Sequence, residues 1–185
     1  MEFRAMRNID NGVELTTAYI DEAQSHQERQ EQLDAYGFQC QCPSCKDPKA
    51  SDARLAWYRE RTPNHVDHMQ QLLDWLMDPT MPVNTVVRCS LELLAGTEED
   101  GLEATLWYLE HLEYVVDMYC AAEDEGQAVV YMSKLDTIRH VLTGRQKPSV
   151  AELRRMVKEH HKWGWKSSVT EFLGLCSRLR REGKK

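Results

Sequence analysis

The feature that most constrains the fold is a succession of apolar stretches with helical spacing, which begins near Ser51 and continues almost to the C-terminus. In the longest stretch, residues 102–122, apolar side chains recur every three or four positions and therefore share one helix face. These side chains belong to Leu106, Leu109, Leu112, Val116 and Tyr119. Because short turns separate the stretches, they predict consecutive antiparallel helices, an arrangement similar to a tetratricopeptide array.

Shorter amphipathic stretches surround this one, and they cover residues 55–58, 69–76, 86–94 and 130–142. We expect Pro79 and Pro82 to end the second stretch, because proline lacks the N–H donor that a helix interior needs. Gly96 and Gly144 are expected to end the third and the last, because glycine readily adopts the left-handed conformation of a helix terminus. Residues 124–126, Asp-Glu-Gly, are expected to turn the chain between the two longest stretches.

The N-terminal residues follow a strand pattern instead. Residues 2–7 alternate in polarity and predict a short strand, and residues 13–19 are rich in β-branched and aromatic side chains, which favour a second. Asp10-Asn11-Gly12 lies between them, and Asn and Gly tolerate the positive φ of a tight reversal. The chain is therefore predicted to be mainly α, with a short β-hairpin before the helices.

A short helix and an irregular loop are expected to connect these two regions. Ser25 and Glu28 form the pattern of a capping box, in which the serine oxygen and the glutamate carboxylate satisfy backbone N–H groups at the helix start. The helix continues to Tyr36, and Gly37 is placed to end it. Residues 40–49 then predict a metal-organised loop, because two prolines limit regular structure there.

Three of the six cysteines lie within that loop, at Cys40, Cys42 and Cys45. Three thiolates at this spacing can converge on one zinc ion, which requires four ligands in a tetrahedron. The alternative is three unrelated thiols. His65 and His68 lie one helical turn apart and could supply a fourth ligand, although their polar neighbours favour a solvated helix face. The other cysteines stand singly in apolar helical contexts, at Cys89, Cys120 and Cys176.

The bulk properties exclude several classes of protein. The formal net charge of −7 argues against a general nucleic-acid binder, and no apolar run approaches the roughly 20 residues that span a bilayer. Residues 1–10 lack the apolar segment of a secretory signal. We therefore expect no nucleic-acid or membrane partner and an intracellular location, cytoplasmic, nuclear or both, where cysteines remain reduced.

Two motifs in the first fifty residues resemble the end of a SET domain. Residues 12–20, Gly-Val-Glu-Leu-Thr-Thr-Ala-Tyr-Ile, resemble the Gly-Glu-Glu-Leu-Thr-x-x-Tyr-Ile segment of SET protein lysine methyltransferases. Residues 28–45, Glu-Arg-Gln-x-x-Leu-x-x-Tyr-Gly-Phe-x-Cys-x-Cys-Pro-x-Cys, resemble the SET-and-MYND branch and its fungal relatives. The order and spacing of the two motifs are more specific than either alone. The resemblance covers about residues 2–46, while the C-terminal part agrees only in its helical character.

The resemblance implies a role for each matching residue. Tyr19 would orient the lysine amine and the sulfonium of S-adenosylmethionine, and Tyr36 would line a narrow lysine channel. Phe38 would pack against the adenine of S-adenosylmethionine. The post-SET zinc ligands would be Cys40, Cys42 and Cys45, with a fourth cysteine from the SET core. By residue type alone, Tyr19 and Phe38 would be assigned to a packed core.

The match also has a gap. The family's Gly-rich cofactor segment and its Asn-His-x-x-x-Pro-Asn-like knot do not occur in this sequence. We therefore expect the C-terminal portion of a SET methyltransferase, inactive in this form, whose whole enzyme acts on a lysine-containing protein. The expected domains are the end of the SET domain at 1–24, the post-SET helix and zinc loop at 25–50, and a helical C-terminal domain at 51–185.

A function of a different class is also consistent with the sequence. A non-enzymatic module could bind a partner protein on the helical array, because such arrays present concave surfaces that suit peptides. Catalysis needs the missing cofactor segments, whereas a binding module does not. Residues 160–165, His-His-Lys-Trp-Gly-Trp, are expected to form an amphipathic surface helix anchored by its tryptophans, since adjacent histidines point to different helix faces.

Overall fold

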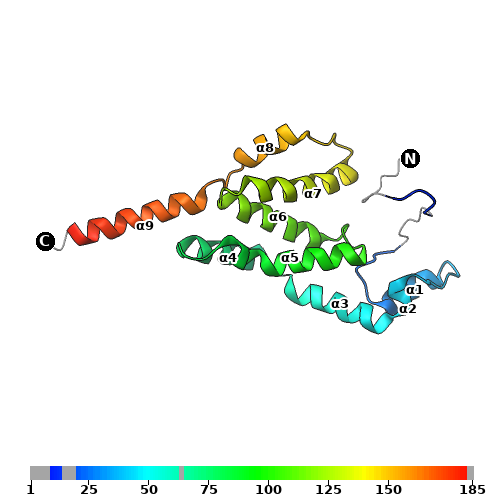
Figure 1. The fold of residues 1–185 in the computed structure, drawn as a ribbon. Helices are drawn as coiled ribbons and strands as arrows, with labels where there is room; N and C mark the ends of the chain where they lie inside the picture. Colours follow the sequence, from blue (N-terminus) through cyan, green and yellow to red (C-terminus); the bar gives the residue numbers. More distant parts are fainter. Residues whose placement is uncertain (1–8, 14–19, 63–64, 183–185) are drawn as a thin grey trace.

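A computed structural model of the chain describes residues 9–13, 20–62 and 65–182 (Figure 1). Within these ranges the chain is mainly α, as predicted, and contains no strand. The helices are α1 (His26–Asp34), α2 (Pro43–Lys46), α3 (Pro48–Arg61), α4 (His65–Met77), α5 (Val83–Asp100), α6 (Leu106–Ala121), α7 (Glu125–Thr143), α8 (Val150–Lys158) and α9 (Trp165–Glu182). Asp10 accepts a hydrogen bond from the N–H of Val13 in the expected turn, but the two predicted strands lie outside the described residues.

Consecutive helices from α4 to α8 pack against each other, and α6 lies at the centre of the molecule between α5 and α7 (Figure 1). Helix α8 covers α7, and α9 contacts α4 and α6. The side chains of α6 are buried on most of its faces, which is typical of a core helix. Its fully buried apolar residues include Leu112, Val115, Val116 and Met118. None of the helices in the described ranges is long and apolar enough to cross a membrane.

Helix α5 continues past Gly96, so the prediction that this glycine ends the helix was wrong. The helix ends at Gly101, which has a left-handed φ of 75°, and the N–H of Leu102 donates to the carbonyl of Thr97 at 2.8 Å. A Cβ atom at Gly96 would lie only 2.9 Å from the hydroxyl oxygen of Tyr58. The glycine therefore permits the close approach of α3 to the interior of α5.

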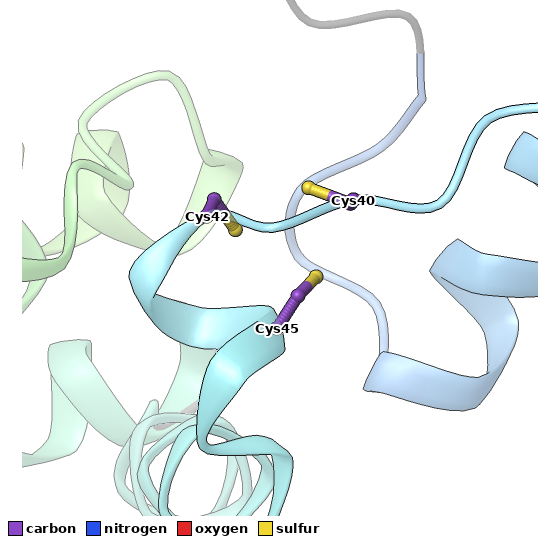
Figure 2. A group of neighbouring side chains, drawn as sticks. All are labelled: Cys40, Cys42 and Cys45. Carbon is purple, nitrogen blue, oxygen red and sulfur yellow. The ribbon is translucent and has the colours of Figure 1, made fainter.

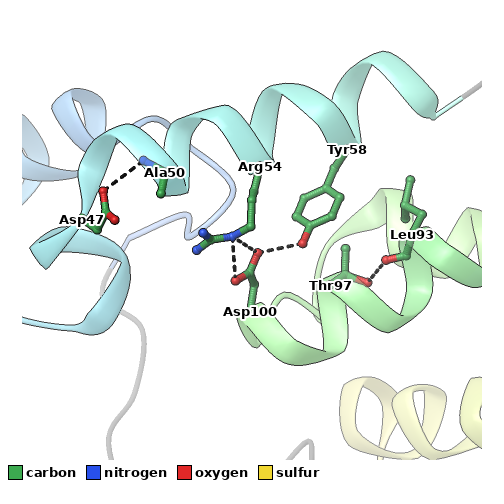
Figure 3. Close-up of polar contacts among 7 residues, drawn as sticks. All are labelled: Asp47, Ala50, Arg54, Tyr58, Leu93, Thr97 and Asp100. Carbon is green, nitrogen blue, oxygen red and sulfur yellow. Dashed lines mark hydrogen bonds and ion pairs between the residues drawn. The ribbon is translucent and has the colours of Figure 1, made fainter.

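A polar cluster joins α3 to the end of α5 (Figure 3). Tyr58 donates its hydroxyl proton to Asp100 at 2.7 Å, and Nε of Arg54 pairs with the same carboxylate at 2.9 Å. Burial and the negative charge of Asp100 raise the pKa of Tyr58, so the tyrosine remains a hydrogen-bond donor. At the other end of α3, the carboxylate of Asp47 accepts from the N–H of Ala50 and caps the helix. Asp47 is also the C-terminal cap of α2.

Several helix ends differ from their predicted positions. The region 40–49 is not irregular, because α2 and α3 each begin with a proline, which fits the first turn where no N–H donor is needed. Helix α6 begins at Leu106, four residues later than predicted. Gly126 lies inside the first turn of α7, and Asp124 caps that helix by accepting from the N–H of Gln127.

Residues 160–164 form a turn between α8 and α9, not the surface helix that we expected, and Trp165 is the first residue of α9. Lys162 is buried, and its ammonium group pairs with Asp117 on α6. Nε2 of His160 lies 3.4 Å from the same carboxylate, and the N–H of Gly164 donates to the carbonyl of Cys120. These contacts fix the start of α9 to α6. The tryptophans do anchor the segment, because Trp163 and Trp165 pack against the core.

His68 is buried, although its polar neighbours predicted a solvated face. Its ring stacks on Tyr114 with centroids 4.3 Å apart, and it meets the ring of His111 edge-on at 5.4 Å. Nδ1 of His111 lies 2.9 Å from the hydroxyl of Ser90. A polar cluster thus occupies the core between α4, α5 and α6, so His68 is not a member of the cysteine group.

Candidate metal centre

The three clustered cysteines converge, as predicted. The sulfur atoms of Cys40, Cys42 and Cys45 all lie within 4.8 Å of one another (Figure 2). Cys42 caps the short helix α2, and Cys45 lies in its first turn, where its N–H donates to the carbonyl of Cys42 at 3.0 Å. This turn brings their sulfurs to the same side, and Cys40 faces them from the preceding segment. Among the described residues, this is the one group of three or more histidine, cysteine or acidic side chains that can hold a metal ion.

Hydrogen bonds distinguish the thiols of this cluster. Burial alone would raise the pKa of Cys42, but the N–H groups of Cys45 and Ser44 and the neighbouring thiols hold it below its ordinary value. Burial, together with the nearby Cys42 and Cys40 side chains, raises the pKa of Cys45 to about 11. Without a cation, Cys42 therefore loses its proton more readily than Cys45. A metal ion would replace these protons, because thiolates rather than thiols are metal ligands.

A buried guanidinium lies next to the cluster. Arg29 on α1 is only 6% exposed; its Nη1 donates to the carbonyl of Gln24, and its Nη2 lies 4.0 Å from the sulfur of Cys45. No ion pair between described residues includes Arg29. Because burial of an uncompensated charge is costly, Arg29 favours a negatively charged neighbour. A thiolate or metal–thiolate group supplies that charge.

The donor set fits zinc. Soft thiolates select zinc over the hard cations magnesium and calcium, and a structural zinc site takes four ligands. The described residues provide three of the four, from Cys40, Cys42 and Cys45.

Two exposed aromatic residues lie between α1 and the cysteines. Helix α1 ends at Asp34 with Ala35 as its C-cap, two residues earlier than predicted, and Gly37 lies in the following turn with the expected left-handed φ of 64°. Tyr36 and Phe38 flank it, and both rings are more than half exposed. Neither packs into the core, which residue type alone had predicted for Phe38. Tyr19, the predicted catalytic residue, lies outside the described residues.

Sequence reasoning missed Arg29. Its spacing from Leu33 could have indicated that it is buried, because residues four positions apart share a helix face. Arg29 and Leu33 are the two buried side chains of α1. The helix is otherwise polar, so an arginine on its buried face has to meet an acceptor or a negative charge. Only the fold shows that this partner is the cysteine cluster.

Comparisons with known proteins give two partial matches. The chain is 43% identical over 47 residues to Histone-lysine N-methyltransferase ATXR2 of Arabidopsis thaliana, covering 25% of this chain and 10% of that enzyme. It is 44% identical over 63 residues to Histone-lysine N-methyltransferase set5 of Schizosaccharomyces pombe, covering 29% of this chain and 20% of that enzyme. No family model and no solved structure matches. The matches support a relationship to SET-family methyltransferases, and they span a fifth or less of these relatives.

Proposed function

We propose that this chain is the C-terminal portion of a SET-family protein lysine N-methyltransferase. The main support is that three cysteine sulfurs lie within 4.8 Å of one another. The chain that holds them also partly matches two histone-lysine methyltransferases. In this proposal residues 1–24 end the SET domain, residues 25–50 form the post-SET helix and zinc loop, and residues 51–185 form a helical C-terminal domain. The whole enzyme acts on a lysine-containing protein.

The proposed zinc role is structural. Zinc held by Cys40, Cys42 and Cys45 fixes the segment that follows α1, and the fourth ligand comes from outside the described residues. Tyr36 and Phe38 lie four and two positions before the first cysteine, so fixing the loop also fixes the positions of their rings. In the proposal, the ring of Tyr36 lines the lysine channel and the ring of Phe38 packs against the adenine of S-adenosylmethionine.

The chemistry is a direct transfer. S-adenosylmethionine supplies the methyl group, whose bond to sulfur breaks as the bond to the lysine nitrogen forms. The lysine must first lose a proton, because only the neutral amine has a lone pair. Tyr19 is proposed to orient that amine, and Tyr36 to exclude water from the channel, so that the reacting atoms are held in line. The described residues do not complete the cofactor pocket, so the chain alone is proposed to be inactive.

The first test is zinc stoichiometry on the purified chain after removal of metal and reconstitution. One zinc per chain, lost in Cys42→Ser and retained in Cys89→Ser, supports the proposed centre. Cys89 is the matched control because it is an exposed single cysteine on α5. Absence of stoichiometric zinc in the unsubstituted chain would overturn the metal centre. Calorimetry with S-adenosylmethionine on the same sample tests the cofactor part separately.

A second candidate function is a protein-binding helical module. It is favoured by the position of the two hydrophobic clusters, which within the described ranges include no residue before Leu55. The helical part therefore has its own core and does not depend on the cysteine loop for packing. Methyl transfer by a longer form containing the cofactor segments would favour the enzyme, whereas partner binding unchanged by Cys42→Ser would favour the module.

A further inference from the structure

Helix α9 projects from the rest of the molecule (Figure 1). Its first turns are fixed, because Trp165 and Val169 pack against the core and the ammonium group of Lys166 donates to the carbonyls of Trp75 and Asp78 at the end of α4. The C-terminal half of the helix continues outward, away from the other helices. This half therefore presents a helix face that the described body of the chain does not cover.

That face is apolar along its centre. The side chains of Phe172 and Leu175 are 63% and 47% exposed. Both are apolar residues of α9 that the described chain leaves in contact with solvent. A shallow groove runs along the same face, lined by Ser168, Glu171, Phe172, Gly174, Leu175 and Arg178. Five of these residues stand at i, i+3, i+4, i+7 and i+10, so they share one side of α9: Ser168, Glu171, Phe172, Leu175 and Arg178.

Gly174 lies at one edge of this groove and Phe172 at the other, because residues two positions apart point to nearly opposite sides of a helix. Glycine inside a helix costs roughly 1 kcal/mol relative to alanine. At Gly96 the structure explains the glycine, because Tyr58 lies 2.9 Å from where a Cβ would be. At Gly174 nothing lies within 4 Å of that position, so no contact within the described chain accounts for it. The glycine leaves this edge of the groove open to the side chains of a neighbouring helix.

The charges on the face show which helix fits. Glu171 and Arg178 lie seven residues apart, two turns along the same face, and no ion pair between described residues engages either of them. They are equally far from a point between Gly174 and Leu175. A second α9 in antiparallel orientation therefore brings Glu171 of each copy opposite Arg178 of the other. A parallel copy would place like charges together.

We propose that α9 is a self-association surface, on which a second copy of this chain docks antiparallel about Gly174. The arrangement is isologous, so each copy offers the same patch, and both salt bridges form at once. Phe172 and Leu175 lose their solvent exposure in the shared interface. Because one helix pair buries less surface than a standard interface, the dimer is expected to be weak and dependent on concentration.

The test is sedimentation velocity on the full chain across a concentration series. The unsubstituted chain should shift from monomer toward dimer as concentration rises. Arg178→Glu and Glu171→Arg should each weaken the dimer roughly tenfold, because each places like charges together twice. The double variant Glu171→Arg with Arg178→Glu should restore association, because the pairs are opposite again. Arg155→Glu on α8 makes the same charge change on an exposed residue away from the groove and should have no effect.

Two outcomes would overturn the proposal. The first is a chain that stays monomeric at all concentrations tested. The second is a double variant that associates no better than the single ones, which would mean that residues 171 and 178 do not face each other. Gly174→Leu gives an independent check, since its side chain enters open space in the monomer but should block the approach of the second helix. Circular dichroism confirms that each variant keeps its helical content.

Discussion

The guanidinium of Arg29 lies 4.0 Å from the sulfur of Cys45, and the arginine is buried without a carboxylate partner among the described residues. A cation in this position lowers the electrostatic cost of gathering several thiolates around one metal ion. The arginine also anchors the chain that enters α1, because it donates to the carbonyl of Gln24. It therefore joins the cysteine cluster to the helix before it.

Replacement of Arg29 should weaken zinc binding. Arg29→Met keeps much of the side-chain volume but removes the charge, and we expect the affinity for zinc to fall by about 10- to 100-fold, as is typical for groups that support metal ligands. Arg29→Lys keeps the charge and should recover most of the affinity. Competition with a chromophoric chelator measures both. Equal losses in the two variants would show that the arginine acts through packing and not through its charge.

Cobalt should report on the number of thiolate ligands. Cobalt(II) bound to the reconstituted chain is expected to show the ligand-field bands of a tetrahedral site and a strong thiolate-to-metal band in the near ultraviolet. Cys45→Ser should reduce that band by about one third, because one of three described thiolates is removed. Cys176→Ser should leave the spectrum unchanged, because this cysteine stands alone on α9. An unchanged spectrum in Cys45→Ser would exclude its sulfur as a ligand.

Stability should fall in mild acid because of His111. Burial, with a smaller effect of the His68 side chain, lowers the pKa of His111 to about 4, against an ordinary value of 6.5. Below pH 6.5 the unfolded chain binds a proton that the folded chain does not, so stability is full above pH 6.5 and is lost as pH falls toward 4. The loss should be on the order of 3 kcal/mol, since the side chain is only 1% exposed.

Denaturant unfolding between pH 7.5 and pH 4 measures this loss. His111→Asn should be less stable at pH 7.5, because it leaves a small cavity, but its stability should depend less on pH. His26 is less buried and provides a matched control, so His26→Asn should keep the pH dependence of the unsubstituted chain. Parallel curves for the unsubstituted chain and His111→Asn would contradict the assignment.

Two glycine positions should respond in opposite directions to alanine. Gly96→Ala forces a methyl group toward the hydroxyl of Tyr58, which Asp100 holds at 2.7 Å, so we expect a net loss of about 1–2 kcal/mol despite the better helix propensity. Gly174→Ala meets open space and should not destabilise the chain. Thermal melts of both variants at one concentration measure the difference. A stabilised Gly96→Ala variant would mean that α3 can move away.

The helical part should fold without the cysteine loop. A chain that begins at Asp47 keeps the N-terminal cap of α3 and both hydrophobic clusters, which among the described residues begin at Leu55. It loses contacts at the edge, such as the hydrogen bond from the N–H of His26 to Asp52 and that from Arg59 to the carbonyl of Ala23. We expect a cooperative thermal transition with a somewhat lower midpoint. A non-cooperative melt would contradict an independent core.

Features that depend on neighbouring residues in the chain could be predicted from the sequence. The capping box of Ser25 and Glu28 is present, because both partners lie within one turn of α1. Gly144 caps α7 and Gly37 lies in the turn after α1, both with the expected positive φ, since nothing tertiary is needed for that conformation. The convergence of the cysteines is also local, because one turn of α2 brings their sulfurs together.

Features that depend on distant partners could not be predicted. The reason for Gly96 is a tyrosine 38 positions earlier, and the reason for the buried Lys162 is Asp117 on another helix. His68 has polar neighbours along the chain but aromatic neighbours in space. In each case the residue type and its sequence neighbours were read correctly, but the burial was set by a helix that packs against it. The assigned roles of Tyr19, Tyr36 and Phe38 stay predictions, because they concern molecules that the chain would bind.

Asp47 is at once the last cap of α2 and the first cap of α3. No linker residue therefore separates α2 of the cysteine loop from α3 of the helical body, and the two helices follow each other directly. Hydrogen bonds from the N–H of His26 to Asp52 and from Arg59 to the carbonyl of Ala23 also hold the preceding segment against α3, so the helical body fixes the position of the cysteine cluster. In the proposed zinc site, the fourth ligand would therefore have to reach a cluster whose position is set by the helical body.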